Sequence, residues 1–334
     1  MTDAATGRRF DRALVERSLP WTGRVAAVFR RAALLEPDVP GEPRLTLLAE
    51  ERPLVPGGIA LPWNDFAPRP GEPARLDGRT LRLGDATAGT QRTVRLEGDG
   101  VSLRLAPPRD PHDLEGPAVR WAPLPLPQRT RVLLGLDPVP EAGVEAAALR
   151  RAAAGLRALA DALVTARPDP GTTEERPDAP SRDAAGAAAW DRRVRALAGL
   201  GPGSTPTGDY LLVGFAAAGK VLADAGRVSP SACDAFLAAL QRLPADVTSP
   251  VGREMLAHAA RGSFPEPLLA LVACWREPRR DAADVVAAMT ALADVGAHSG
   301  ADMLAGALAV LLRSPWADGA PASPPFSARP PPPV

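Results

Sequence analysis

Apolar and polar residues alternate in short stretches in the first third of the chain, and this pattern predicts strands. The clearest stretches are Arg24–Phe29, Arg79–Leu83, Thr93–Leu96 and Val101–Leu105. A period of two with charges on one face is typical of half-buried antiparallel strands. Gly98-Asp99-Gly100, between the last two stretches, predicts a hairpin turn. We therefore expect a small antiparallel β-domain over residues 22–138, preceded by an N-terminal helical segment, residues 1–21, with its helix near 9–19.

From about residue 141 the apolar residues recur every three or four positions, which predicts helices. Helices are expected near residues 141–165, 187–199, 209–225, 229–242, 250–261, 265–276, 281–295 and 301–313. Pro230, Pro250 and Pro265 lie near three of these starts, where proline is tolerated. The predicted fold class is α+β, with the β-domain followed by a mainly helical domain over residues 139–313.

Two proline-rich segments have too few apolar residues to form a core. Residues 166–188 combine proline, glycine and charge, and we expect a flexible loop there within the helical domain. Residues 314–334 end in Pro330-Pro331-Pro332-Pro333-Val334 and are expected to be a disordered tail.

Charge and hydropathy exclude several classes of protein. The 39 basic and 39 acidic residues balance, whereas a general nucleic-acid binder shows a basic excess. Neither a membrane-spanning apolar run nor an apolar signal segment is evident, so we expect a cytoplasmic protein without membrane partners. Arginine is abundant while Lys220 is the single lysine, a bias of composition that does not by itself indicate phosphate recognition. The spacing of the two cysteines and three histidines predicts neither a metal site nor a cofactor.

The segment Gly199–Asp209 carries the clearest chemical signal. Four glycines and three hydroxyl residues directly precede a predicted helix. Converging backbone N–H groups and the positive end of a helix dipole form a cradle for an anion. The segment is neither a Walker loop nor a dinucleotide fingerprint. The candidate ligand-binding residues here are Gly201, Gly203, Ser204, Thr205, Thr207, Gly208 and Asp209.

A second segment, residues 299–306, repeats the order of residues 207–214: a hydroxyl residue, glycine, two variable positions, two apolar positions, a small residue and glycine. The repetition predicts two helix starts of like construction that face each other across one pocket. Its candidate ligand-binding residues are His298, Ser299 and Gly300. The candidate catalytic residues of both segments are Asp209, His298 and Asp302.

A structural interpretation of the same residues is also open. Thr207 and Ser299 suit helix N-caps, and residues 299–302 fit a capping box. Gly214 and Gly306 are also explained if they only permit close helix packing. An imidazole at His298 suits an acid, a base or an anion contact, and equally a structural role in a loop.

Gly201-Pro202-Gly203-Ser204-Thr205-Pro206-Thr207-Gly208-Asp209-Tyr210 resembles the hallmark loop of a largely uncharacterised bacterial family, Gly-Pro-Gly-x-Thr-Pro-x-Gly-Asp-Asp. That family includes the AllH-type subunit of oxamate carbamoyltransferase. Residues 298–306 resemble a second hallmark, and Thr248-Ser249 with Met255–Gly262 resembles a middle block. The likeness is good over residues 190–312 and looser over 22–125. Tyr210 stands where the family usually has its second aspartate.

The resemblance implies a subunit that works with two other kinds of subunit. The enzyme transfers a carbamoyl group between oxalurate and phosphate during allantoin degradation, so phosphate or a small carboxylate or carbamoyl ligand is implied. Two alternatives remain open: a non-catalytic phosphate- or carboxylate-binding or regulatory protein that diverged from the enzyme subunit, and a purely structural subunit.

Overall fold

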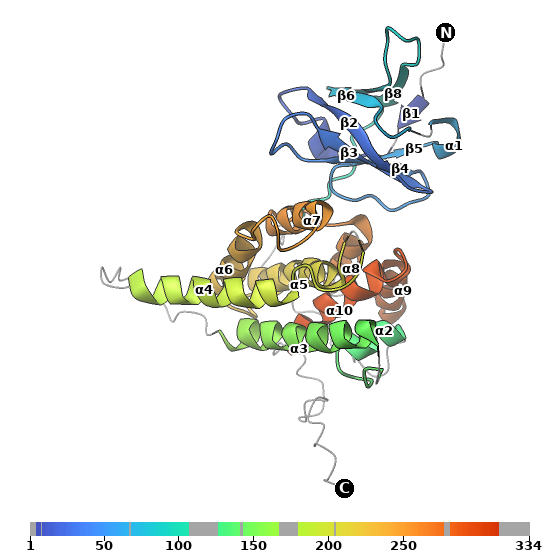
Figure 1. Ribbon diagram of the computed structural model, residues 1–334. Helices are drawn as coiled ribbons and strands as arrows, with labels where there is room; N and C mark the ends of the chain where they lie inside the picture. The colour runs from blue at the N-terminus through green and yellow to red at the C-terminus, as the bar shows by residue number, and fades with distance from the viewer. Residues whose placement is uncertain are drawn as a thin grey trace. The chain divides into compact units, whose positions relative to one another are not determined.

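The computed structural model describes residues 5–7, 9–66, 68–106, 126–140, 143–166, 180–203, 205–276 and 281–313. The chain folds into two compact units. The first contains residues 1–104 and 263–266, and the second contains residues 105–262 and 267–334. A sheet forms the first unit and helices form the second, which confirms the α+β fold class (Figure 1). The predicted domain boundaries stay predictions.

The first unit is an eight-stranded sheet with the order β1-β8-β7-β6-β2-β3-β4-β5. The strands are β1 (Ala5–Gly7), β2 (Trp21–Val28), β3 (Ala32–Pro37), β4 (Leu45–Ala49), β5 (Gly58–Leu61), β6 (Pro73–Asp77), β7 (Thr80–Leu83) and β8 (Arg92–Leu96). The pairs β1–β8 and β4–β5 are parallel, and the others are antiparallel. Because β1 contacts β5 and Phe10 forms a bridge with Ile59, the two ends of the sheet approach each other and the sheet curls.

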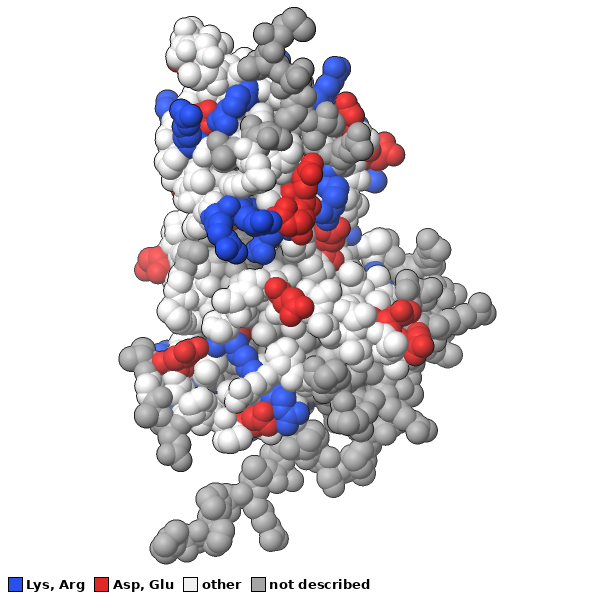
Figure 2. Space-filling model, turned by 90° about the vertical axis from the view of Figure 1, so that its right-hand side faces the viewer, with Lys and Arg blue, Asp and Glu red and all other residues white. Residues whose placement is uncertain are grey.

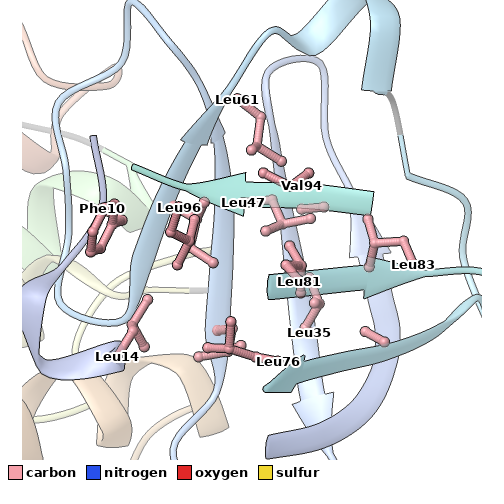
Figure 3. Close-up of a cluster of buried hydrophobic side chains, with 14 of the residues drawn as sticks. Phe10, Leu14, Leu35, Leu47, Leu61, Leu76, Leu81, Leu83, Val94 and Leu96 are labelled. Atoms are coloured by element: carbon pink, nitrogen blue, oxygen red, sulfur yellow. The ribbon is translucent and has the colours of Figure 1, made fainter. Parts of the chain in front are cut away.

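The apolar positions of the alternating pattern form the core of the curled sheet. In β6 the side chains of Ala74 and Leu76 are buried, while those of Pro73, Arg75 and Asp77 are exposed. Figure 3 shows the inward-facing side chains of several strands gathered in one cluster. The cluster includes Leu35, Leu47, Leu61, Leu76, Leu81, Leu83, Val94 and Leu96.

The predicted helix near residues 9–19 is wrong. Phe10 forms a bridge with Ile59 and its ring is buried in the core, so the chain stays extended there. Only the single 3-10 turn η1 (Arg12–Leu14) follows, and the Asp11 carboxylate caps it by accepting from the N–H of Ala13. The predicted hairpin around Gly98–Gly100 does not form either, because Val101 pairs with Asp11 instead of returning along β8.

Residues 263–266 of the chain belong to the first unit although they lie in the sequence between segments of the second. Ser263 forms a bridge with Arg104. The N–H of Phe264 donates to the Leu103 carbonyl at 2.9 Å. The chain therefore leaves the first unit and returns to it once, far along the sequence.

The helices of the second unit are α2 (Gln128–Leu133), α3 (Val144–Thr165), α4 (Pro180–Leu197), α5 (Thr207–Asp224), α6 (Pro230–Gln241), α7 (Pro250–Ala260), α8 (Glu266–Arg276), α9 (Ala282–Ala293) and α10 (Ser299–Leu311). The eight predicted helices correspond to α3–α10. The helix α2, and α1 (Trp63–Phe66) in the first unit, were not predicted. Because α4 begins at Pro180, residues 180–188 are not the loop that the sequence suggested. Residues 167–179 and the predicted tail lie outside the described residues.

The two central helices are α5 and α10, which pack side by side in the helical unit (Figure 1). From Ala301 to Leu311 every residue of α10 is buried, and in α5 nearly all are. A helix that is apolar on all sides needs neighbours on all sides. Helices α4, α6 and α7 contact α5, while α2, α3 and α9 contact α10.

Within the part of the chain that the structure describes, no helix is both long and apolar enough to cross a bilayer. On the face drawn in Figure 2, basic and acidic side chains form small groups separated by uncharged surface.

Candidate functional site

The two repeated segments begin the central helices, and their glycines pack against each other's helix. A Cβ added at Gly214 of α5 would overlap the carbonyl oxygen of Met303 in α10. A Cβ added at Gly306 of α10 would overlap the carbonyl oxygen of Leu211 in α5. Gly214 and Gly306 occupy equivalent positions of the repeat, and so do Leu211 and Met303. The packing of the two helices is therefore symmetric. Each helix uses the glycine at the equivalent position of the repeat to let the backbone of the other helix approach.

The likeness extends to the helix that precedes each central helix. A Cβ at Gly208, the second residue of α5, would overlap the carbonyl oxygen of Leu197, where α4 ends. A Cβ at Gly300, the second residue of α10, would overlap the carbonyl oxygen of Leu292, in the last turn of α9. The repeated unit is thus a helical hairpin, formed once by α4–α5 and once by α9–α10. Both glycines, predicted as ligand contacts, have a packing role.

Arg129 of α2 joins the two helix starts. Its Nε donates to the Asp302 carboxylate at 2.6 Å, and its Nη2 donates to the Thr207 hydroxyl at 2.8 Å. Its Nη1 also donates to the exposed Glu145 carboxylate at 2.9 Å. The side chain of Arg129 is 15% exposed and that of Asp302 is 2% exposed. The two helix starts are thus linked directly through one guanidinium, while the predicted pocket between them stays a prediction.

The buried environment of the Asp302 carboxyl opposes its ionisation. Burial raises the pKa of this carboxyl, while Arg129 and the Thr207 hydroxyl lower it, and burial prevails. The Arg129 guanidinium is shared between Asp302 and Glu145. Its charge is therefore already balanced, and it is a structural cation of the site.

Asp209 lies apart from this link, on the side of α5 that faces α7. Its side chain is fully buried and accepts hydrogen bonds from the Gly199 N–H, at 2.9 Å, and from the Thr248 hydroxyl. A Cβ on Gly252, in the first turn of α7, would overlap this carboxylate. Burial raises the pKa of Asp209, and the two hydrogen bonds lower it less than burial raises it. Asp209 therefore ties together the end of α4 and the beginnings of α5 and α7.

The proposed helix caps are wrong. The N-cap residues of α5 and α10 are Pro206 and His298, and neither makes a side-chain capping hydrogen bond. Thr207 and Ser299 are the first residues inside their helices. The Thr207 hydroxyl does not cap the helix and accepts from Arg129.

The glycine-rich segment that precedes α5, residues 199–206, is called the Gly-rich loop below. It supplies backbone N–H groups that have no acceptor. Within the described residues, the N–H groups of Gly201, Gly203, Thr205 and Thr207 have no hydrogen-bond acceptor. Gly201 has φ +116° and Gly203 has φ +100°, a region that side chains other than glycine rarely adopt. A Cβ on Gly203 would meet nothing within 4 Å, so this part of the loop faces open space. Ser204 lies outside the described residues.

The helix start contributes fewer donors than the sequence suggested. The Gly208 N–H donates to the Leu200 carbonyl, and the Asp209 N–H donates to the Pro206 carbonyl. In α10 the Gly300 N–H donates to the Val295 carbonyl in the same way. An anion here would therefore be held by the loop before α5, since these N–H groups of the helices are already bonded.

His298 is exposed, while Ser299 and Tyr210 are half-buried. His298 precedes α10 and its charge acts on Asp302, four residues later. Of the three candidate catalytic residues, only His298 is accessible to solvent. Asp209 and Asp302 are bonded within the protein. Among the described residues, no group of three His, Cys, Asp or Glu side chains is placed to hold a metal ion.

Sequence reasoning missed Arg129, which lies in an unpredicted six-residue helix far from either motif. Its neighbours, Pro127 and the mixed residues after it, have no pattern that marks a site. Thr248 did lie in the middle block, although its bond to Asp209 was not foreseen.

No curated protein matches this chain, and no solved structure matches it. One family model matches, and it covers both central helices, the Gly-rich loop, Thr248 and His298. It does not extend to Arg129 or to the sheet. Residues 197–311, about a third of the chain, are similar to the family described as oxamate carbamoyltransferase subunit AllH.

Proposed function

We propose that this chain is the AllH-like subunit of a carbamoyltransferase-type complex and that its Gly-rich loop binds the phosphate or carboxylate group of the reactants. The relation to an oxamate carbamoyltransferase subunit rests on the family match over residues 197–311. The observation that carries the binding role is the set of unpaired N–H groups at Gly201, Gly203, Thr205 and Thr207, within the described part of the chain.

Backbone donors suit this ligand chemistry. Backbone N–H groups in a glycine-rich turn bind anions, and the dipole of α5 adds partial positive charge next to them. The same donors stabilise negative charge that develops on oxygen during acyl-type transfer. Phosphate and oxalurate, the reactants that the resemblance implies, both carry such oxygens.

The acid–base chemistry is assigned to His298, together with residues of partner subunits. Asp209 is fully buried and accepts two internal hydrogen bonds. Asp302 is paired with Arg129. Neither carboxylate is free to take a proton from substrate, whereas the imidazole of His298 is exposed. A single chain of this kind therefore supplies anion binding and one titratable group, which fits a subunit that needs partners.

The loop is tested by the replacement Gly203→Val, with thermal unfolding followed with and without inorganic phosphate. We expect phosphate to raise the melting temperature of the native chain and not that of the variant. Gly98→Val is the matched control, because Gly98 also has positive φ (+84°) and open space around its Cβ. Equal phosphate stabilisation of the native chain and Gly203→Val would refute the loop as the site.

The complex is tested by purifying the tagged chain from its native host and identifying what accompanies it. Stoichiometric recovery of two companion subunits, followed by conversion of oxalurate and phosphate to carbamoyl phosphate and oxamate, is the expected result. A solitary chain that still binds phosphate would favour the second function below.

The second candidate is a non-catalytic phosphate- or carboxylate-binding or regulatory protein in the same metabolism. Tyr210 favours it, because a phenol stands where the family usually has its second aspartate. The Tyr210→Asp variant discriminates the two. A gain of carbamoyl transfer in that variant, with none in the native chain, supports divergence from the enzyme. The cytoplasmic location stays a prediction.

A further inference from the structure

A groove of about 240 Å³ lies on the outer face of the sheet, over β2, β6 and β7. Three arginines line it: Arg24 of β2, Arg75 of β6 and Arg82 of β7. Asp38 is the one acidic residue in its lining, among the residues that the structure describes. The hollow therefore has a clear excess of positive charge, in a chain whose total charge is zero.

The strand register forces these arginines together. Arg75 and Arg82 are direct cross-strand partners in the antiparallel pair β6–β7. Arg75 is also the partner of Thr22 in β2, and Arg24 lies two residues farther along that strand. Directly opposed side chains on one face are about 5 Å apart at Cβ, and like charges placed there destabilise a sheet.

The protein does little to balance these charges. Within the described residues, Arg24 and Arg82 form no hydrogen bond or ion pair. Arg75 has one partner there, the Asp77 carboxylate on its own strand, at 3.4 Å with both side chains half exposed. A pair so exposed contributes little. Two of the three arginines, Arg24 and Arg82, thus have no ion-pair partner among the described residues, although Asp38 also lines the groove.

Arginine abundance alone does not explain this arrangement. A larger hollow of the same unit, about 570 Å³, is lined by Arg30 and Arg31 together with Glu50 and Glu51. There Arg31 forms an ion pair with Glu51, so the charges of the lining balance. The groove over β6 and β7 differs because its arginines outnumber its acids.

We propose that this groove binds a small oxyanion, the phosphate or carboxylate group of a metabolite. Guanidinium groups match both oxyanions with paired N–H donors. The Thr22 hydroxyl and the Gln91 amide, which also line the groove, add uncharged donors. Its volume lies below the range of about 300–1,000 Å³ usual for drug-sized ligands, which favours a small anion over a nucleotide. This site is separate from the Gly-rich loop and does not depend on the proposed function.

The test follows the side-chain Nε–H signals of arginine in the full chain by NMR, with inorganic phosphate and with malonate as the two probes. The variants Arg24→Gln, Arg75→Gln and Arg82→Gln assign the signals. We expect the three signals to shift together and to saturate. The probe with the lower dissociation constant indicates whether the site prefers phosphate or carboxylate. Arg82→Gln should weaken binding at the remaining two arginines at least tenfold. Arg95→Gln is the matched control, because Arg95 is exposed on β8 and lies outside the groove.

Several results would overturn the proposal. One is the absence of a saturable shift with either probe. Another is an equal shift of Arg95, which would indicate a general ionic atmosphere. Thermal unfolding without anions gives an independent check: Arg82→Gln should melt at a higher temperature than the native chain, because one of two opposed charges is removed. A lower melting temperature would show that Arg82 stabilises the native structure without an anion, and this would contradict the proposed anion site.

Discussion

Gly214 and Gly306 are equivalent residues of two helices, and each admits the backbone of the other's helix. A hydrogen at each position takes the place of a side chain that would overlap the carbonyl of Met303 or Leu211. Close approach of this kind is available only to glycine. The repeat that was visible in the sequence as eight matching positions therefore has a physical meaning, since it encodes one interface twice.

The replacement Gly214→Ala should destabilise the protein severely. The added Cβ would overlap a backbone carbonyl in the fully buried helix pair, and the cost of such overpacking is about 2–4 kcal/mol. The free energy of unfolding from urea denaturation measures it. Gly306→Ala should cost a similar amount.

Gly186→Ala is the control for this pair. Gly186 also lies inside a helix, α4, but a Cβ there would meet nothing within 4 Å. Alanine has a higher helix propensity than glycine, so this variant should be more stable than the native chain by about 0.5–1 kcal/mol. Equal effects at Gly186 and Gly214 would contradict the packing argument.

Removing the guanidinium that joins the helix starts should also be costly. In Arg129→Leu the Asp302 carboxyl stays buried without a cation, and breaking a buried pair in this way costs about 3–5 kcal/mol. This loss of stability should grow as the pH rises. At low pH the Asp302 carboxyl, whose pKa is raised, is protonated in the folded state and needs no cation. Urea unfolding at pH 5 and pH 8 measures both effects.

The double variant Arg129→Leu/Asp302→Leu should recover much of that stability, since no buried charge remains. Arg131→Leu is the matched control on the same helix, because Arg131 forms an exposed pair with Asp137. Little change is expected there. A loss at Arg131 as large as that at Arg129 would mean that the helix, and not the buried pair, is responsible.

Asp209 should give the protein a distinct pH dependence. Its folded pKa is raised by burial, so the native state binds a proton more tightly than the unfolded state. Stability contributed by this group is therefore greatest at low pH and falls as pH rises through the folded pKa. Relative to Asp209→Asn, the native chain should lose stability as the pH rises above about 4. Asp234→Asn, at an exposed position of α6, should leave the slope unchanged.

His258 should have the opposite sign. Burial, and to a smaller extent Arg261, lowers its pKa to about 4. The neutral imidazole is favoured although Glu254 lies 3.9 Å away. Stability is complete above pH 6.5 and falls as pH decreases toward 4, by up to roughly 3 kcal/mol. His258→Gln should flatten the unfolding free energy over this range, while the same change at exposed His298 should not.

The periodicity of apolar residues was sufficient to predict the α+β class and the eight longer helices. It failed at Phe10, where pairing with Ile59 holds the backbone extended, and at Val101, where Asp11 competes with β8 as the partner. Both failures involve residues far apart in the sequence. A local pattern carries no information about such partners.

The site was predicted in part for the same reason. Thr207 and Asp302 were found because the repeat marks them, and the structure brings them to one guanidinium. The guanidinium itself was not found, since Arg129 belongs to neither motif. The glycines at 208 and 300 were interpreted as ligand contacts because sequence alone does not separate a glycine that admits a ligand from one that admits a backbone.

The return of residues 263–266 to the first unit bears on how the molecule unfolds. The Glu266 N–H donates to the Leu54 carbonyl, and the Leu54 N–H donates to the Glu266 carboxylate. A fragment that ends at residue 104 would lose both bonds, together with the bond from Phe264 to Leu103. The first unit, though not its sheet, is thus completed by a segment that lies in the sequence between α7 and the first turn of α8. All eight strands precede residue 104, whereas residues 263–266 follow it, so no single cut in the chain would release the whole first unit.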